Sequence, residues 1–255
     1  MRGRYPSTHG FAPSFGPGPL TPAIKMIIAA NVVMFVLTSV MGRVLVQWLG
    51  LTPQDTFGGL RIWQPFTYMF LHGGIFHILF NMLALWMFGT ELERMWGSRY
   101  FTKYYFVTGL GAAATQIVLA FMPGAFGDQM YLTTTIGASG AIFGVLLAYA
   151  LYFPNRTILF MFIFPLPAKI FVTIIGAIAL YSAMGGGGGV AHSAHLGGLV
   201  AGYLYLKRVR MNLLSEIQYR WVKWRINRMR RRFDVYSGGR SDDVRRADDV
   251  DRRVH

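Results

Sequence analysis

Six apolar stretches constrain the fold of this chain more than any other feature. They lie at about 24–41, 73–90, 101–122, 137–153, 168–184 and 190–206. Each is close to the roughly 17–25 residues that a helix needs to cross a bilayer. Because 53% of the residues are hydrophobic and only 14% are charged, nothing outside the stretches could cover them in water. The sequence therefore predicts an all-α membrane protein, a bundle of six transmembrane helices.

The charges between these stretches predict how the bundle is oriented. The connections near 91–103 and 154–169 are basic, and they alternate with 123–136 and 185–189, which carry no Lys or Arg. Because cytoplasmic loops are enriched in Lys and Arg, both termini are expected in the cytoplasm. The first connection, 42–72, is expected outside although it carries arginines, and its tryptophans favour a place in the membrane interface.

The two ends of the chain differ in composition from its apolar body, 24–206. Residues 1–23 are rich in Gly and Pro and are expected to form an irregular leader. The tail, 207–255, carries 15 Lys or Arg against 7 Asp or Glu, which favours anionic lipid over nucleic acid as its partner. Residues 211–236 fit a basic amphipathic helix on the inner leaflet, or an ordinary solvated helix, and 237–255 are expected to be disordered.

Few ionisable side chains fall inside the predicted spans, and each is a candidate functional residue because burying it in lipid is costly. The chain has no cysteine, which excludes disulfides and thiolate chemistry. No Asp or Glu lies within a span, so a Ser-His-Asp triad lacks its third member and no metal site is expected. Four histidines remain near span ends, namely His72, His77, His192 and His195.

Ser139 has two interpretations from its neighbours alone. Its surroundings, GASGA at 137–141, do not have the order of the G-x-S-x-G nucleophile elbow. Gly140 and Gly144 form a small-xxx-small pair, which favours close helix packing with Ser139 as a packing residue. A histidine within hydrogen-bond reach would instead make the hydroxyl a nucleophile.

The sixth apolar stretch favours the nucleophile. Ala194, Gly198 and Gly202 recur every four residues, and this face can approach the glycine pair of the fourth stretch closely. The fourth and sixth spans run in the same direction. Ser139 and His195 are therefore expected at similar depth, where the imidazole can activate the hydroxyl.

The second apolar stretch adds two hydrogen-bond donors. His77 and Asn81 are four residues apart and share one helical face. With the Ser139 backbone N–H, they could stabilise the oxyanion that forms when a serine attacks a carbonyl. The alternative is a His–Asn pair that only bridges helices or binds water.

Together these residues resemble the rhomboid family of intramembrane serine proteases, over about residues 24–206. Four segments carry the resemblance, in the family's order and spacing: WQPFTYMFLHGGIFHILFNM (63–82), FGTELERMWGS (88–98), GASGAIFG (137–144) and AHLGGLVAG (194–202).

This resemblance implies a six-helix bundle with a Ser–His dyad and no metal or other cofactor. Ser139 would be the nucleophile and His195 the general base, with His77, Asn81 and the Ser139 amide lining the oxyanion hole. It also implies single-span membrane proteins as substrates, cut near the outer membrane face. No nucleic acid partner is expected, because the basic tail follows an apolar body. The expected supporting residues are His72, Phe143, which would stack on the dyad histidine, Gly137, Gly140 and Gly198.

The sequence departs from the family pattern at two places. The family often has Trp-Arg in the first loop, whereas here Arg61 precedes Trp63 with one residue between them, so no role is assigned to Arg61. His192 is not a required residue of the family and is interpreted as a helix-start hydrogen bonder or a substrate-facing side chain. The glycines 185–189 fit either a cap that gates the site or a simple hairpin.

Two other functions stay open from the sequence: an inactive family member that binds membrane clients, and a six-span transporter. Intact Ser139 and His195 disfavour the first, and the absence of an inverted repeat disfavours the second. The charge pattern and the lack of a transit peptide favour a bacterial inner membrane.

Overall fold

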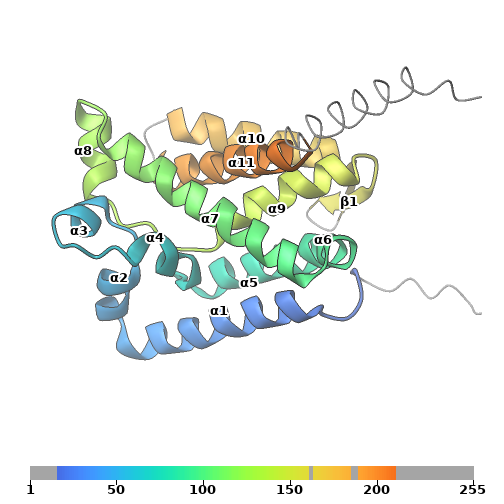
Figure 1. Ribbon diagram of the computed structural model, residues 1–255, viewed down its shortest axis with the longest axis horizontal. Coiled ribbons are helices and arrows are strands. Elements are labelled where there is room, and N and C mark those ends of the chain that lie inside the picture. Colours follow the sequence, from blue (N-terminus) through green and yellow to red (C-terminus); the bar gives the residue numbers. More distant parts are fainter. Residues whose placement is uncertain (1–15, 161–162, 185–188, 211–255) are drawn as a thin grey trace, which may run out of the picture. The chain divides into compact units, whose positions relative to one another are not determined.

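A helix covers each of the six predicted apolar stretches in a computed structural model of the chain, which describes residues 16–160, 163–184 and 189–210 (Figure 1). The long helices are α1 (Pro22–Met41), α5 (Ile75–Ala84), α7 (Ser98–Ala120), α9 (Ser139–Tyr152), α10 (Ala168–Met184) and α11 (Gly189–Arg210). Contacts divide the chain into two units, residues 1–207 and 208–255, and the first holds everything discussed below. The tail predictions, for 211–236 and 237–255, and most of the glycine loop lie outside the described residues.

The second long helix extends further than predicted. After α5 the helix continues through a π-helical turn, η2 (Leu85–Gly89), into α6 (Thr90–Trp96), whereas the sequence predicted an end near residue 90. The continuous helix therefore contains Glu91 and Glu93, which lie just beyond the predicted span 73–90.

Two of the later connections contain regular structure that was not predicted. Residues 123–136 include a short helix, α8 (Ala125–Leu132). The basic connection 154–169 contains an antiparallel hairpin, in which β1 (Thr157–Phe160) pairs with β2 (Phe164–Pro167). The prolines of β2 are tolerated because both strands of a two-stranded sheet are edge strands. The part of the chain that the structure describes is thus helical with one hairpin.

The first connection folds into three short helices and a 3-10 turn. They are α2 (Arg43–Leu49), α3 (Pro53–Phe57), α4 (Gln64–Thr67) and η1 (Tyr68–Phe70). A bridge between Leu51 and Thr135, with N–H···O distances of 3.0 and 2.8 Å, joins this connection to the segment just before α9. The connection is therefore tied to the start of α9.

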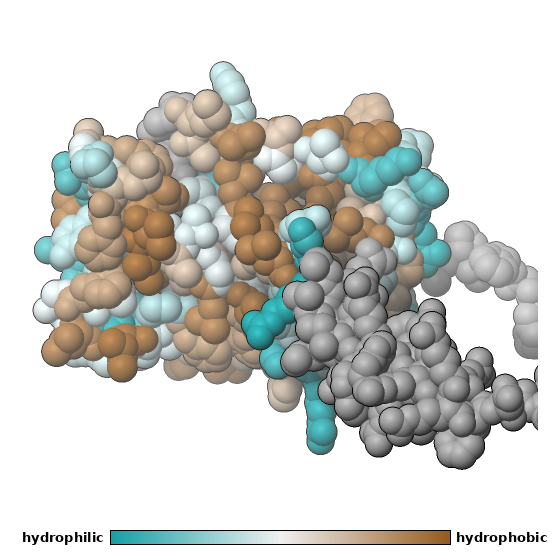
Figure 2. Space-filling view, turned by 45° about the horizontal axis from the view of Figure 1, so that its top comes forward, coloured by the Kyte–Doolittle hydropathy of each residue, from teal (hydrophilic) through white to brown (hydrophobic). Residues whose placement is uncertain are grey.

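Large side chains fill the interior, and apolar side chains also cover the surface. Tyr68, Tyr104 and Tyr105 are fully buried, whereas Val36 on α1 and Phe76 on α5 are more than half exposed. Figure 2 shows hydrophobic residues over much of the visible face. Within the described residues, α1 and the continuous helix Ile75–Trp96 are long and apolar enough to cross a membrane by length and composition.

Glu93 joins the start of α1 to the end of α6. Its carboxylate is buried, with 2% of the residue exposed, and accepts the N–H groups of Ala23 at 2.8 Å and Ile24 at 3.0 Å. The hydroxyls of Thr21 and Ser98 also donate to it. Two of the N–H groups left unpaired at a helix start are thus satisfied by a residue 70 positions away.

We expect Glu93→Gln to destabilise the fold by about 2 kcal/mol, because an amide replaces a charged acceptor that four donors face. The thermal unfolding midpoint of the purified protein measures this. Glu91→Gln is the matched control, because Glu91 pairs with the half-exposed Arg156 and such ion pairs contribute at most about 1 kcal/mol. Equal losses in both variants would contradict the proposed importance of the Glu93 network.

Candidate active site

The Ser139 hydroxyl lies within hydrogen-bond distance of the His195 imidazole. Ser139 is the first residue of α9, and His195 lies near the start of α11. The Ser139 Oγ and His195 Nε2 atoms are 2.8 Å apart, in a partly buried position. These two predicted residues, 56 positions apart in the sequence, are thus brought together.

Close contact between glycines produces this arrangement. A Cβ atom built on Gly198 would lie 1.9 Å from the Gly140 carbonyl oxygen, and one built on Gly202 would lie 3.3 Å from the Gly144 Cα. Because residues 140 and 144 face 198 and 202 in the same order, α9 and α11 run parallel with their backbones in contact. This confirms the predicted glycine contact between the fourth and sixth stretches.

His77 points a hydrogen-bond donor toward Ser139. Its Nδ1 accepts the Gly73 N–H at 3.3 Å, so in the neutral ring the proton is on Nε2. A Cβ built on Gly137 would lie 2.8 Å from this Nε2 and 3.8 Å from the Ser139 Oγ. The space beside Gly137, where φ is +123°, is therefore bordered by both groups and is open only because the residue is glycine.

Asn81 and the Ser139 backbone are the other predicted oxyanion donors. Asn81 lies one turn after His77 on α5, is 8% exposed, and donates one amide N–H to the His77 carbonyl at 2.7 Å. An amide group has a second N–H that can donate elsewhere. The Ser139 N–H, at the first position of α9, has no partner within its own helix and lies at the positive end of the helix dipole.

Sequence comparison adds to this geometry. A family model, the Rhomboid domain, matches residues 59–211, which is more than half of the chain. The chain belongs to the rhomboid family. A rhomboid domain is a helical membrane bundle, so the protein is an integral membrane protein.

Similar rhomboids occur in bacteria and in mitochondria. The chain is 37% identical over 143 residues to Rhomboid protease GluP of Bacillus subtilis, covering 55% of this chain and 25% of that protein. It is 34% identical over 139 residues to the mitochondrial Rhomboid protein 1 of Saccharomyces cerevisiae, covering 53% and 38%. It is 28% identical over 199 residues to Putative rhomboid protease YdcA of Bacillus subtilis, covering 72% and 87%. The matches with the first two relatives span well under half of each of those proteins.

Phe143 lies where the resemblance to rhomboids implied. Its ring stacks on the His195 ring with centroids 4.3 Å apart and 7° between the planes. Phe143 is one turn after Ser139 on α9. The same helix therefore positions the hydroxyl and the aromatic ring that contact the His195 imidazole. The stacking holds the ring plane in which Nε2 faces Ser139.

We expect Phe143→Leu to lower the rate of peptide cleavage by about threefold to tenfold, and Phe143→Tyr to restore most of it. Loss of an aromatic pair costs about 0.5–1.5 kcal/mol, which corresponds to this change in rate. Cleavage rates of the two variants, measured at equal folded protein, check this. A leucine variant as active as the parent would show that stacking does not position His195.

The other two predicted histidines lie beside the site. His72 is 3% exposed and its ring meets that of His77 edge-on, with centroids 4.9 Å apart. Burial, with a contribution from His77, lowers the pKa of His72 to about 4, so the ring is neutral near pH 7. His192 is half-buried one turn before His195, and the two rings meet edge-on at 5.6 Å.

Tyr68 is a supporting residue that the sequence did not single out. Its carbonyl accepts the Gly137 N–H at 2.9 Å, and its buried hydroxyl donates to the Gly109 carbonyl at 2.8 Å. It therefore holds the turn before Ser139 against α7. Only its place within the 63–82 motif could have pointed to it, because no periodicity or charge distinguishes it.

Proposed function

We propose that the protein is an intramembrane serine endopeptidase that uses Ser139 and His195 as a catalytic dyad. The observation that carries this proposal is the 2.8 Å contact between the Ser139 Oγ and the His195 Nε2 in a member of the rhomboid family. A serine hydroxyl bonded to an imidazole is the minimal arrangement that activates serine as a nucleophile. Relatives whose names describe them as rhomboid proteases support the same activity.

The reaction follows from the positions of these groups. The His195 Nε2 takes the proton of the Ser139 Oγ as the oxygen attacks the scissile carbonyl. The carbonyl oxygen, now negative, sits in the space beside Gly137, where it accepts hydrogen bonds from His77 Nε2–H, the Ser139 N–H and the second amide N–H of Asn81.

Collapse of this intermediate completes the first half of the reaction. His195 protonates the amine as the C–N bond breaks, which leaves an acyl group on Ser139. A water molecule, deprotonated by the same imidazole, then attacks the ester and releases the acid. No group outside the chain and water is needed to balance the protons.

The proposed substrates are membrane proteins with a single transmembrane span, cut near the outer face. Ser139 and His195 lie near the starts of α9 and α11, at one end of the bundle, which in the proposed orientation is the outer end with both termini in the cytoplasm. Small helix-breaking residues near the cut should help, because a helical backbone hides its carbonyls. We further propose six membrane crossings, a bacterial inner membrane and a basic tail on anionic lipid.

Cleavage in a bilayer tests this function. The full chain is reconstituted into vesicles with a single-span reporter protein, and the masses of the products locate the cut. We expect cleavage within or at the edge of the reporter's span, and its loss after treatment with a fluorophosphonate. Binding of the intact reporter without cleavage would instead indicate an inactive family member, and proton flux without cleavage would indicate a transporter.

A further inference from the structure

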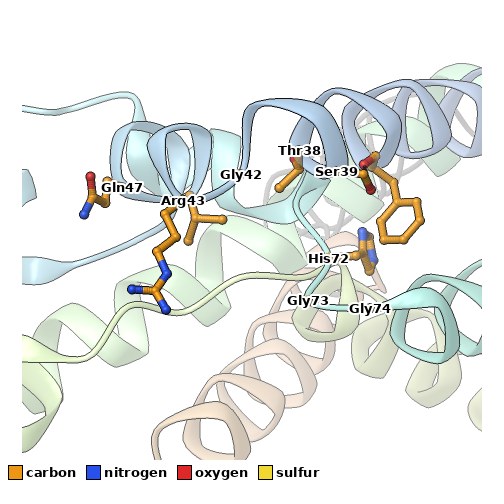
Figure 3. Close-up of a pocket in the computed structure, with 10 residues that line it drawn as sticks. Thr38, Ser39, Gly42, Arg43, Gln47, His72, Gly73 and Gly74 are labelled. Carbon is orange, nitrogen blue, oxygen red and sulfur yellow. Dashed lines mark hydrogen bonds between the residues drawn. The ribbon is translucent and has the colours of Figure 1, made fainter.

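A cavity of about 570 Å³, open to the surface, lies between the α1–α2 junction and the segment that leads into α5 (Figure 3). Phe35, Arg43 and Val46 line one side, and His72 and Gly73 line the other. The volume is that of a small-molecule site. The cavity is separate from the dyad. Gly73 lines the cavity and donates its N–H to the Nδ1 of His77, so it lies between the cavity and His77.

One charged group at the cavity lacks a partner. Arg43 is exposed, and among the described residues it has no carboxylate within salt-bridge distance. His72 forms part of the opposite wall, but it is buried and its ring nitrogens are not accessible from the cavity. The cavity therefore offers one cation to a ligand.

The depth of the cavity in the membrane follows from α1. This helix has 20 residues, so it is about 30 Å long, which is the thickness of the hydrocarbon core. Gly42, with φ of +62°, ends the helix, and Arg43 follows at once. Arg43 therefore lies at the level of the lipid headgroups, in the leaflet at the Ser139 end of the bundle.

We propose that this cavity binds one anionic phospholipid of that leaflet. The guanidinium of Arg43 pairs with the phosphate, for which its planar array of donors is suited. The first methylene groups pack against Phe35 and Val46. The cavity thus combines an unpaired cation with apolar walls at headgroup depth, which matches the chemistry of such a lipid.

Native mass spectrometry of the full chain in non-ionic detergent tests this proposal. Because the measurement needs no hydrolysis, its result does not depend on the proposed activity. The added ligands are dioctanoyl phosphatidylglycerol, dioctanoyl phosphatidylcholine and inorganic phosphate. We expect one phosphatidylglycerol per chain, held about tenfold more tightly than the other two. Arg43→Gln should weaken it about tenfold, since a charged hydrogen-bonded pair is worth roughly one such factor.

Two further variants make the result specific. Lys25→Gln removes one exposed positive charge from the other end of α1 and should leave binding within about twofold of the parent. Val46→Trp fills the cavity and should abolish binding although Arg43 is intact. The proposal is overturned if phosphatidylglycerol is not retained, or if phosphatidylcholine or free phosphate binds equally well. It is also overturned if Lys25→Gln weakens phosphatidylglycerol binding as much as Arg43→Gln does, or if Val46→Trp leaves that binding unchanged.

Discussion

Replacing Ser139 by alanine should lower the rate of cleavage by about 1000-fold or more, and His195→Ala should lower it by a similar factor. The reason is that the two side chains act as one unit: without the imidazole the hydroxyl keeps its proton, and without the hydroxyl the imidazole has nothing to activate. For the same reason, the double variant Ser139→Ala with His195→Ala should be no slower than either single variant.

Rates of reporter cleavage by the three variants measure this prediction. Ser182→Ala is the matched control, because Ser182 is a half-buried serine on α10, whereas the dyad residues lie on α9 and α11, and its loss should change the rate less than twofold. A His195→Ala enzyme that keeps a tenth of the parent rate would contradict the dyad. A double variant whose cleavage rate is far below that of both single variants would also contradict the dyad, because it would mean that Ser139 and His195 act independently.

Gly198→Ala should lower the rate by about 100-fold through a single added methyl group that touches no substrate. The new Cβ would lie 1.9 Å from the Gly140 carbonyl oxygen and 2.8 Å from its carbon, and neither is the end of a flexible side chain. The helices α9 and α11 must therefore move apart. A misplacement of about 1 Å between reacting groups costs about 100-fold in rate.

Gly176→Ala provides the control for this prediction. Gly176 lies within α10, and a Cβ there would meet only the Leu199 Cδ1 at 3.6 Å, an ordinary contact. We expect it to keep the parent rate, or to gain slightly in stability because alanine favours helices. Circular dichroism and thermal unfolding would separate a shifted dyad from an unfolded protein. A folded Gly198→Ala enzyme with the parent rate would show that the backbone contact does not position His195.

The positions of the main helices and of the dyad could be predicted because each leaves a signal in the local sequence. The range 168–184 for α10 follows from apolar residues alone, and its ends agree with the structure. Ser139 and His195 could be placed together because small residues repeat every fourth position in both segments, and such a repeat permits close helix contact.

Other parts of the fold leave weaker signals. The helix beyond Gly89 was missed because Glu91, Glu93 and Arg94 resemble a loop, yet Glu93 is buried by its bonds to the start of α1. The hairpin at 157–167 was missed because prolines usually argue against strands. The bonds of Glu93 join residues about 70 positions apart, which local composition does not record.

Within the site, the chemistry of His77 could be predicted only in part. Its position one turn before Asn81 is a sequence property, but the proton on Nε2 depends on the Gly73 N–H that occupies Nδ1. The open space beside Gly137 likewise depends on a backbone angle that a glycine permits but does not specify. Both features become visible only when the backbone is built.

The reaction of the protein with a fluorophosphonate tests the central claim most directly. Such a probe reacts with a serine that a neighbouring base has activated, and peptide mass spectrometry then identifies the modified residue. We predict one adduct per chain, on Ser139, which is lost in His195→Ala although Ser139 is still present. An unmodified Ser139 in the folded parent protein, or an adduct that forms equally well without His195, would contradict the assignment of these two residues as a catalytic dyad.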